Sequence, residues 1–334
     1  MSRYEELKQV LDQRRYFKIV CGAGNEDCDE VRKLSLVYTL AGATGIDVSA
    51  NPEVVSNAVL GVERAVAFSR ARGREIFPRP FINVSIGMKG DPHIRKAEIA
   101  SKVCIQCGKC LDVCLQKAIS KTFVVMQKRC IGCGQCAKVC SVEAVSFSDT
   151  NRELKAILPE CLRRGAETFE LHAIIEDDAS VMADWNLLNE ILRDNFISMC
   201  LDRSQLSDVH LMRRIRQAQE IARERLIIQA DGVPMSGGAD DFNTTLQAVA
   251  IADIIRKNNV SVYVLASGGT NSTTGELACL CGVVLHGVSI GTFARKIVGV
   301  FIDDPQFEKD EHALSLAVKR ARELVDANLE KIHG

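Results

Sequence analysis

Residues 103–147 read VCIQCGKCLDVCLQKAISKTFVVMQKRCIGCGQCAKVCSVEAVSF, and this stretch determines how the rest of the chain is interpreted. It contains the pattern C-x2-C-x2-C-x3-C twice. Three closely spaced thiolates can each reach a different iron of one [4Fe-4S] cluster, whereas the fourth binds the neighbouring cluster. We therefore expect two clusters with crossed ligands, one on Cys104, Cys107, Cys110 and Cys140 and the other on Cys130, Cys133, Cys136 and Cys114.

Zinc sites and disulfides are the alternatives for these cysteines, and both fit the spacing poorly. Zinc sites typically pair two cysteines with two more distant ligands and do not use a third cysteine at this spacing. The proline that commonly follows the fourth cysteine is replaced by Leu115 and Ser141. Because proline fixes φ in such a turn, its absence predicts a different turn geometry rather than lost ligation.

Outside this stretch, apolar strand-like runs alternate with amphipathic helical patterns. This alternation predicts an α/β fold with a parallel sheet and helical crossovers. Eight units predict a closed (β/α)8 barrel of the TIM type, and an open doubly wound sheet with an extra edge strand is the alternative. The predicted strands are Phe17–Cys21, Gly45–Ser49, Phe81–Ile86, Thr168–Ile175, Phe196–Leu201, Leu226–Ala230, Ser261–Ala266 and Val283–His286.

The cysteine-rich stretch lies between the third predicted strand and the helix that follows it. We expect residues 1–92 to form the first part of the barrel, with strands one to three. Residues 93–150 are then an inserted ferredoxin-like module with two [4Fe-4S] clusters, and residues 151–334 supply strands four to eight and a C-terminal helix. Loops that follow barrel strands open onto the C-terminal face, where active sites lie. The clusters are therefore expected over the barrel mouth.

Two glycine-rich segments follow the last predicted strands, LASGGTNSTTGE at 265–276 and HGVSIGTFARK at 286–296. In (β/α)8 barrels these loops often bind a phosphate group through backbone N–H groups and a helix N-terminus. The alternative is that the glycines only permit tight turns. The predicted ligand-binding residues are Gly268, Gly269, Gly287, Ser289, Gly291 and Thr292, with Arg295 and Lys296 nearby in sequence.

Polar residues also end other predicted strands. Three pairs have a spacing of two residues, which puts both members on one side of the strand: Asp47 and Ser49, Asn83 and Ser85, Glu170 and His172. Further candidates are Lys89, Cys200, Asp202, Arg203, Gln229 and Asp231. Cys21 is either a reactive thiol or a buried inert one, and the role of His286 is equally open. The loop at residues 230–241 is either a lid or a flexible turn.

Length, net charge and hydrophobic content limit the classes of protein to which this chain can belong. The chain has 334 residues, 47% of them hydrophobic, which suffices for a barrel of about 250 residues and a small module. A net charge of −1 gives no electrostatic reason to expect a nucleic-acid partner. No apolar run approaches the roughly 18 residues of a membrane span, and the N-terminal segment lacks the apolar centre of a signal peptide. Since the cysteines outside the two runs form no paired framework, we expect a cytoplasmic protein.

Together with FKIVCGAGNEDCDEVRKLSLVYTLAGATGIDVSA at 17–50 and LASGGTNSTTGELACLCG at 265–282, the cysteine runs carry a family resemblance. The chain resembles the light-dependent period (LdpA-type) iron-sulfur proteins of cyanobacteria over nearly its full length. The resemblance implies a redox-sensitive input to the circadian clock, with clock signalling proteins as partners. The cysteine runs alone are generic to ferredoxins.

These sequence features lead to two functional hypotheses, each from a different class of protein. The first is a redox-sensing electron-transfer protein that exchanges electrons with ferredoxin or similar redox partner proteins. The second is an iron-sulfur oxidoreductase whose clusters exchange electrons with FMN or another phosphorylated ligand at the barrel mouth. The sequence leaves open whether the protein is an enzyme.

Overall fold

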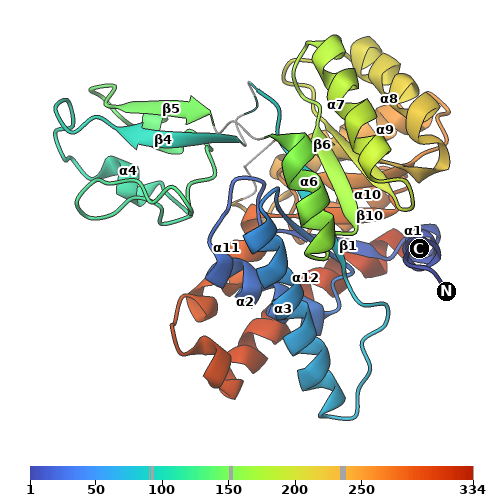
Figure 1. Ribbon diagram of the computed structural model, residues 1–334, viewed down its shortest axis with the longest axis horizontal. Helices are drawn as coiled ribbons and strands as arrows, with labels where there is room; N and C mark the ends of the chain where they lie inside the picture. The colour runs from blue at the N-terminus through green and yellow to red at the C-terminus, as the bar shows by residue number, and fades with distance from the viewer. Residues whose placement is uncertain (90, 92–93, 150–152, 234–237, 334) are drawn as a thin grey trace.

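The computed structural model describes residues 1–89, 91, 94–149, 153–233 and 238–333. Eight parallel strands close into a barrel in the order β1-β10-β9-β8-β7-β6-β3-β2, which confirms the predicted barrel and excludes the open sheet (Figure 1). The strands are β1 (Tyr16–Val20), β2 (Gly45–Ser49), β3 (Phe81–Ile86), β6 (Thr168–His172), β7 (Ile197–Leu201), β8 (Leu226–Asp231), β9 (Tyr263–Ser267) and β10 (Gly287–Ile290).

Helices cover the outside of the barrel, because strand residues that face outward are apolar and pack against the apolar stripes of the helices. Asn51 caps α3 ahead of Pro52, and Asp241 caps α9 by accepting from the Thr244 N–H. The covering helices are α2 (Cys28–Ala41), α3 (Pro52–Arg70), α6 (Leu154–Arg163), α7 (Asp178–Ile191), α8 (Asp208–Ala222), α9 (Phe242–Lys257), α10 (Thr274–Leu280), α11 (Thr292–Ile302) and α12 (Glu311–His333), with short 3-10 turns at Arg223–Arg225 and Phe307–Lys309.

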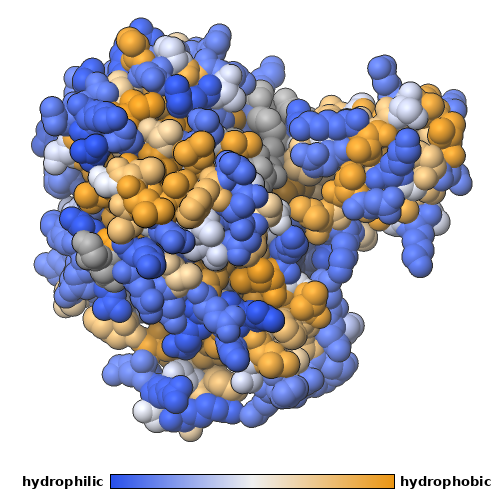
Figure 2. Space-filling view, turned by 180° about the vertical axis from the view of Figure 1, so that it is seen from behind, coloured by the Kyte–Doolittle hydropathy of each residue, from blue (hydrophilic) through white to orange (hydrophobic). Residues whose placement is uncertain are grey.

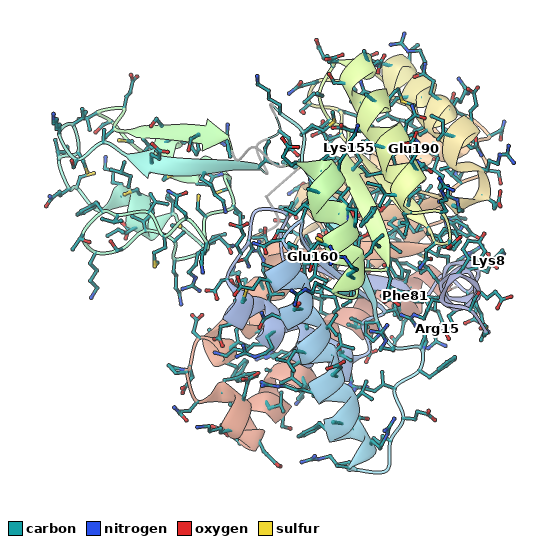
Figure 3. All side chains as sticks on the ribbon, viewed as in Figure 1. Lys8, Arg15, Phe81, Lys155, Glu160 and Glu190 are labelled. Atoms are coloured by element: carbon teal, nitrogen blue, oxygen red, sulfur yellow. The ribbon has the colours of Figure 1, made fainter. Side chains whose placement is uncertain are left out.

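The N-terminal helix α1 (Arg3–Asp12) closes the end of the barrel at which the strands begin. Leu7 and Leu11 are fully buried in a cluster that includes Phe81 and Phe196. Figure 3 labels Lys8 on this helix and Phe81 at the start of β3. With one end plugged, a ligand can enter the barrel only from the end at which the strands finish.

The cysteine-rich segment forms a separate module between β3 and β6. Its strands β4 (Arg95–Ile99) and β5 (Val145–Asp149) pair antiparallel, and two single turns of helix, α4 (Lys109–Asp112) and α5 (Gln135–Lys138), lie between them. The two halves repeat: Gly108 and Gly134 precede the two helices with φ of +84° and +79°. In the space-filling view the module projects from the barrel (Figure 2).

The structure corrects one predicted strand, and several predicted boundaries lie outside the residues that it describes. The eighth strand is Gly287–Ile290, so the prediction of Val283–His286 was wrong. Val283 and Leu285 are buried in the core although they precede the strand, and the glycine that suggested a turn lies in the strand itself. The predicted segment boundaries at residues 92, 93, 150 and 151 lie outside the described residues, as do residues 234–237 of the predicted lid.

Within the described residues, no helix combines the length and apolar character that crossing a membrane requires.

A substitution at Gly287 tests how closely β1 and β10 pack where the barrel closes. A Cβ at this position would lie 2.0 Å from the Tyr16 carbonyl oxygen, so Gly287→Ala forces these strands apart. We expect a loss of about 1–3 kcal/mol in the free energy of unfolding, measured by anaerobic urea titration. Gly299→Ala in α11 is the control: a Cβ there meets nothing within 4 Å, and helix propensity predicts unchanged or slightly higher stability. Equal midpoints for the two variants would contradict this packing.

Candidate functional site

The structure gathers the eight cysteines of the module around two small cavities. One cavity is lined by Cys104, Cys107, Cys110 and Cys140, together with apolar side chains that include Phe123. The other is lined by Cys114, Cys130, Cys133 and Cys136, together with apolar side chains that include Phe147. Each cavity therefore combines three cysteines of one run with the fourth of the other, which is the crossed set expected from the spacing.

Backbone N–H groups point at several of these sulfur atoms. Ala118 N donates to Cys114 Sγ at 3.3 Å, and Ala144 N donates to Cys140 Sγ at 3.2 Å in the other half. Ala97 N, on β4, donates to Cys130 Sγ at 3.3 Å. Such bonds stabilise negative charge on sulfur, as in iron-sulfur proteins.

Burial raises the pKa of three of these thiols, Cys110, Cys114 and Cys136. The pKa of Cys136 is raised to about 11, mainly by burial and to a smaller extent by the neighbouring Cys133 and Cys130. Positive charge supplied in a cavity would stabilise the thiolate form of the cysteines that line it. The donor set of each cavity fits an iron cluster, which would supply that charge.

Both fourth cysteines lead into a turn although proline is absent. Cys114 O accepts from Lys117 N at 2.8 Å, and Cys140 O accepts from Glu143 N at 3.3 Å. Leu115 and the equivalent serine therefore occupy turn positions without preventing the sulfur atoms from reaching the cavities.

The buried side chain of Lys96 fastens the module to the barrel. Its ammonium group donates to Gly24 O at 2.5 Å in the β1–α2 loop, and to Gln127 O at 2.8 Å and Cys130 O at 2.7 Å in the module. Glu26 N adds a bond to Lys128 O at 2.7 Å. The module thus contacts a loop that follows a barrel strand, at the open end of the barrel.

A third cavity lies in the barrel mouth, and it contains five of the six predicted ligand-binding residues: Gly268, Gly269, Ser289, Gly291 and Thr292. The buried side chain of Arg295 also lines this cavity. Ile131, which lies between two cysteines of the module, lines both this cavity and the one around Cys130. The mouth and the second cysteine cavity are therefore neighbours.

The sixth predicted residue, Gly287, lies inside β10 and does not line the cavity. Gly268 has a φ of +63°, and a Cβ there would collide with the Asp231 carboxylate, so this glycine is needed for the turn itself. Ser289 Oγ donates to Gln229 Oε1 at 2.9 Å within the barrel. Thr292 begins α11, whose N-terminus has no side-chain cap and leaves N–H groups available to an anion.

Beneath this cavity, a buried polar network fills the barrel. Lys18 on β1 forms an ion pair with Glu170 Oε2 on β6 and lies 3.9 Å from Asp47 Oδ1 on β2. Asn83 and Ser85 on β3 donate to Asp47 at 2.5 Å each. Five of the six in-phase polar residues predicted on three strands thus meet in one network around Lys18, a residue that was not predicted. The exception is Ser49, whose buried hydroxyl has no hydrogen-bond partner among the described residues.

Charge pairing controls ionisation in the network. Burial alone would raise the pKa of Glu170, but the Lys18 charge and the hydrogen bond from His172 outweigh it and lower the pKa to about 2. Burial opposes ionisation of Lys18 as well, yet the carboxylates raise its pKa. Because the folded pKa of Glu170 lies below its unfolded value of about 4.3, its contribution to stability is complete above that pH and is lost as the pH falls toward 2.

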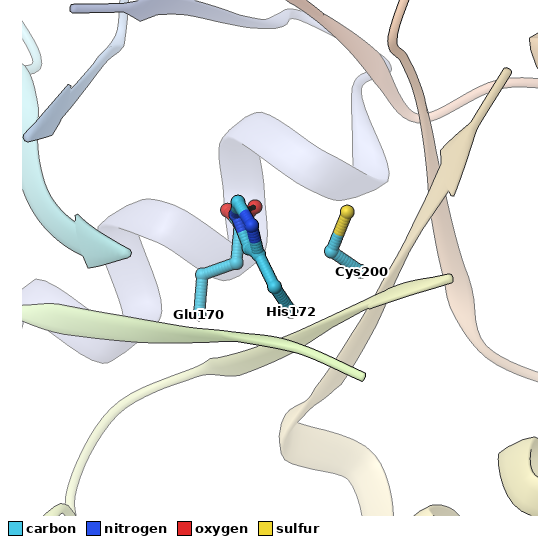
Figure 4. Close-up of side chains that lie close together, drawn as sticks. All are labelled: Glu170, His172 and Cys200. Atoms are coloured by element: carbon cyan, nitrogen blue, oxygen red, sulfur yellow. Dashed lines mark ion pairs between the residues drawn. The ribbon is translucent and has the colours of Figure 1, made fainter. Parts of the chain in front are cut away.

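A second group lies at the cavity floor. His172 Nε2 is 3.3 Å from Glu170 Oε1, and His172 Nδ1 is 3.3 Å from Asp91 Oδ2. Cys200 Sγ on β7 donates to Asp231 Oδ2 on β8 at 3.2 Å. Figure 4 shows the side chains of Glu170, His172 and Cys200 converging from neighbouring strands.

Other predicted candidates have structural roles. Cys21 is fully buried, and burial raises its pKa, which favours the inert reading. His286 Nδ1 accepts from the Val264 N–H at 2.9 Å. Arg203 pairs with Asp208 at 2.8 Å, and Asp202 accepts from the backbone and hydroxyl of Ser204.

Comparisons with known proteins agree with these features. Residues 161–327 match the model of the light dependent period A C-terminal domain, and residues 123–146 match that of the 4Fe-4S binding domain. The chain is 30% identical over 340 aligned positions to "Light dependent period A" of Synechococcus elongatus, covering 98% of this chain and 94% of the relative.

Two solved structures are more distant. The YdjI aldolase of Escherichia coli K12 is 9% identical with a TM-score of 0.46, covering 98% of this chain and 94% of that chain. The aldolase QR15 is 11% identical with a TM-score of 0.42, covering 87% and 96%. At these values neither structure supports an inference about this chain.

The Lys18–Glu170 pair can be tested through stability. Lys18→Met leaves a buried carboxylate without its cation, and we expect a loss of about 3–5 kcal/mol in the free energy of unfolding. Adding Glu170→Gln should recover part of this loss because the unpaired charge is then gone. Urea unfolding followed by the fluorescence of the single tryptophan, Trp185, measures both variants. A single variant as stable as the wild type would show that the pair does not form.

Proposed function

Since this chain belongs to the light dependent period A family, we propose that it is an iron-sulfur protein with two [4Fe-4S] clusters whose redox state acts as a signal. The observation that carries the proposal is the crossed arrangement of cysteines around two cavities. One cluster uses Cys104, Cys107, Cys110 and Cys140, and the other uses Cys114, Cys130, Cys133 and Cys136. When bound, each cluster accepts or donates one electron at a time.

The surroundings of the cavities support exchange with a partner. Cys107 is exposed, and Val103 and Ile105, which are close to it in sequence, leave 49% and 61% of their surface exposed. An apolar patch beside a cluster ligand suits a transient redox partner such as ferredoxin. The name of the Synechococcus elongatus relative points to a light-dependent period, so we propose a redox input to the circadian clock, delivered in the cytoplasm through contacts with clock signalling proteins.

Metal analysis tests the cluster content. Anaerobically purified protein should contain about eight iron and eight sulfide ions per chain, as two [4Fe-4S] clusters require. Iron assays, sulfide assays and electron paramagnetic resonance of the reduced protein measure this. About four iron ions per chain, or zinc in both cavities, would contradict two clusters.

Crossed ligation has its own test. Cys114→Ser should damage the cluster of Cys130, Cys133 and Cys136, although Cys114 belongs to the other run in sequence. We expect iron to fall toward about four ions per chain while the cluster on Cys104, Cys107, Cys110 and Cys140 keeps its signal. The matched control is Cys140→Ser, which should remove the other signal instead. Loss of the cluster bound by a variant's own run would contradict the crossing.

A second candidate function is an oxidoreductase with its site in the barrel mouth. Ile131 favours it, because this single side chain lines both the cluster cavity and the mouth. Gly269, Gly291, Thr292 and Arg295 then bind the phosphate of FMN or of another phosphorylated ligand through N–H groups and a positive charge. FMN exchanges single electrons, which suits a cluster as its partner.

Binding experiments distinguish this candidate from pure sensing. Anaerobic calorimetry with FMN and with simple sugar phosphates should detect binding to the wild type. Gly291→Leu should abolish it with iron content unchanged, because a Cβ at this position already lies 3.3 Å from Val20 and a longer side chain is forced toward the cavity. Gly299→Leu, on the same helix in open space, is the control. If none of these ligands binds the wild type, the sensing function stands alone.

A further inference from the structure

Four side chains at the floor of the mouth have the chemistry of a metal site that is separate from the cysteine module. Glu170, His172 and Cys200 offer an oxygen, a nitrogen and a sulfur atom that all lie within 4.8 Å of one another. Asp231 adds a carboxylate oxygen 3.2 Å from Cys200 Sγ. All four residues are buried and line the mouth cavity.

The spacing of these atoms suits a small tetrahedral ion. Ligand bonds of about 2.0–2.3 Å place neighbouring ligand atoms about 3.3–3.5 Å apart. Glu170 Oε1 and His172 Nε2 are 3.3 Å apart, and the Cys200–Asp231 distance is nearly the same. Within each pair the spacing therefore suits such an ion. Binding would draw the two pairs closer together, since the ligand atoms of Glu170, His172 and Cys200 lie within 4.8 Å of one another.

The groups behind the four side chains also match a metal site. A histidine that binds a metal through one ring nitrogen usually directs the other toward a carboxylate, and His172 Nδ1 lies 3.3 Å from Asp91 Oδ2. Ligating carboxylates are themselves held by hydrogen bonds, and Lys18 and Gln229 both hold Glu170 Oε2 while Oε1 faces the histidine.

Charge points the same way. Two buried acidic groups, Glu170 and Asp231, line the mouth cavity together with the cationic Arg295, and Lys18 holds Glu170 from beneath. Against the effect of burial, the carboxylates of Asp91 and Glu170 raise the pKa of His172, so a bound ion would take the place of its proton. A divalent ion would also allow the Cys200 thiol to bind as a thiolate.

We propose that Glu170, His172, Cys200 and Asp231 bind one divalent ion of the zinc type at the barrel mouth. A mixed set of nitrogen, sulfur and oxygen ligands on three adjacent strands suits zinc, whereas magnesium and calcium prefer oxygen alone. The cavity lies on the open side of the four residues, so an oxygen atom of a ligand held near Gly291 and Arg295 can reach the ion. The site is mononuclear and independent of the iron clusters.

Zinc itself is the probe. Anaerobically purified full-length protein is incubated with Zn2+, dialysed, and analysed for zinc and iron together. We expect one zinc ion per chain in addition to the cluster iron. Zinc-edge X-ray absorption should show one sulfur neighbour at about 2.3 Å and nitrogen or oxygen neighbours at about 2.0 Å.

Variants assign the ligands. Cys200→Ser should remove the sulfur neighbour and weaken zinc binding at least tenfold, and His172→Gln should weaken it similarly, both with iron unchanged. Cys21→Ser is the matched control, because Cys21 is another buried barrel cysteine outside the set. The wild-type spectrum decides the question even where a variant fails to fold. Retention of no zinc, or zinc with four sulfur neighbours as expected in the cysteine module, would overturn the proposal.

Discussion

A buried cation, the ammonium group of Lys96, links the cysteine module to the barrel, and the buried Arg295 adds a second link by donating to Gln116 Oε1 at 2.7 Å. The Lys96 ammonium group donates to the Gly24 carbonyl on the barrel side and to the Gln127 and Cys130 carbonyls on the module side. A buried ammonium group is tolerated only where its donors are used, so all three carbonyl oxygens must stay in place. This contact lies beside Cys130, whose cavity adjoins the barrel mouth through Ile131.

Much of the fold could be predicted because its signals are local and repeated. Strand-like and helical runs alternate along the chain, and seven of the eight predicted strands overlap the observed ones. The eighth failed because two signals competed. Val283–His286 looked like a strand from its apolar residues, and Gly287 looked like a turn, whereas the close approach of Tyr16 is what requires a glycine within the strand. A contact between residues so far apart in sequence leaves no local pattern.

The candidate site was likewise predictable only where the signal is local in sequence. Cysteine spacing predicted which thiols share a cavity, because the reach of a short loop is a local property. The spacing of two between Glu170 and His172 predicted that they share a side of β6. It did not predict that Cys200 and Asp231, on the next two strands, would line the same cavity. Lys18 was missed although it left a signal, since a lysine in the middle of the apolar strand Tyr16–Val20 must find a buried partner. Asp91 follows β3 in a loop and has no such signal.

The two halves of the module have the same local backbone arrangement but different surroundings. The half with Cys107 faces solvent beside the exposed Ile105, whereas the half with Cys130 adjoins the barrel through Ile131. Cys107 is exposed at the first cavity, whereas none of the four cysteines of the second cavity is exposed. The duplicated motif has therefore produced two cavities of unequal accessibility. One of them is directed toward the solvent, and the other is directed toward the interior of the molecule.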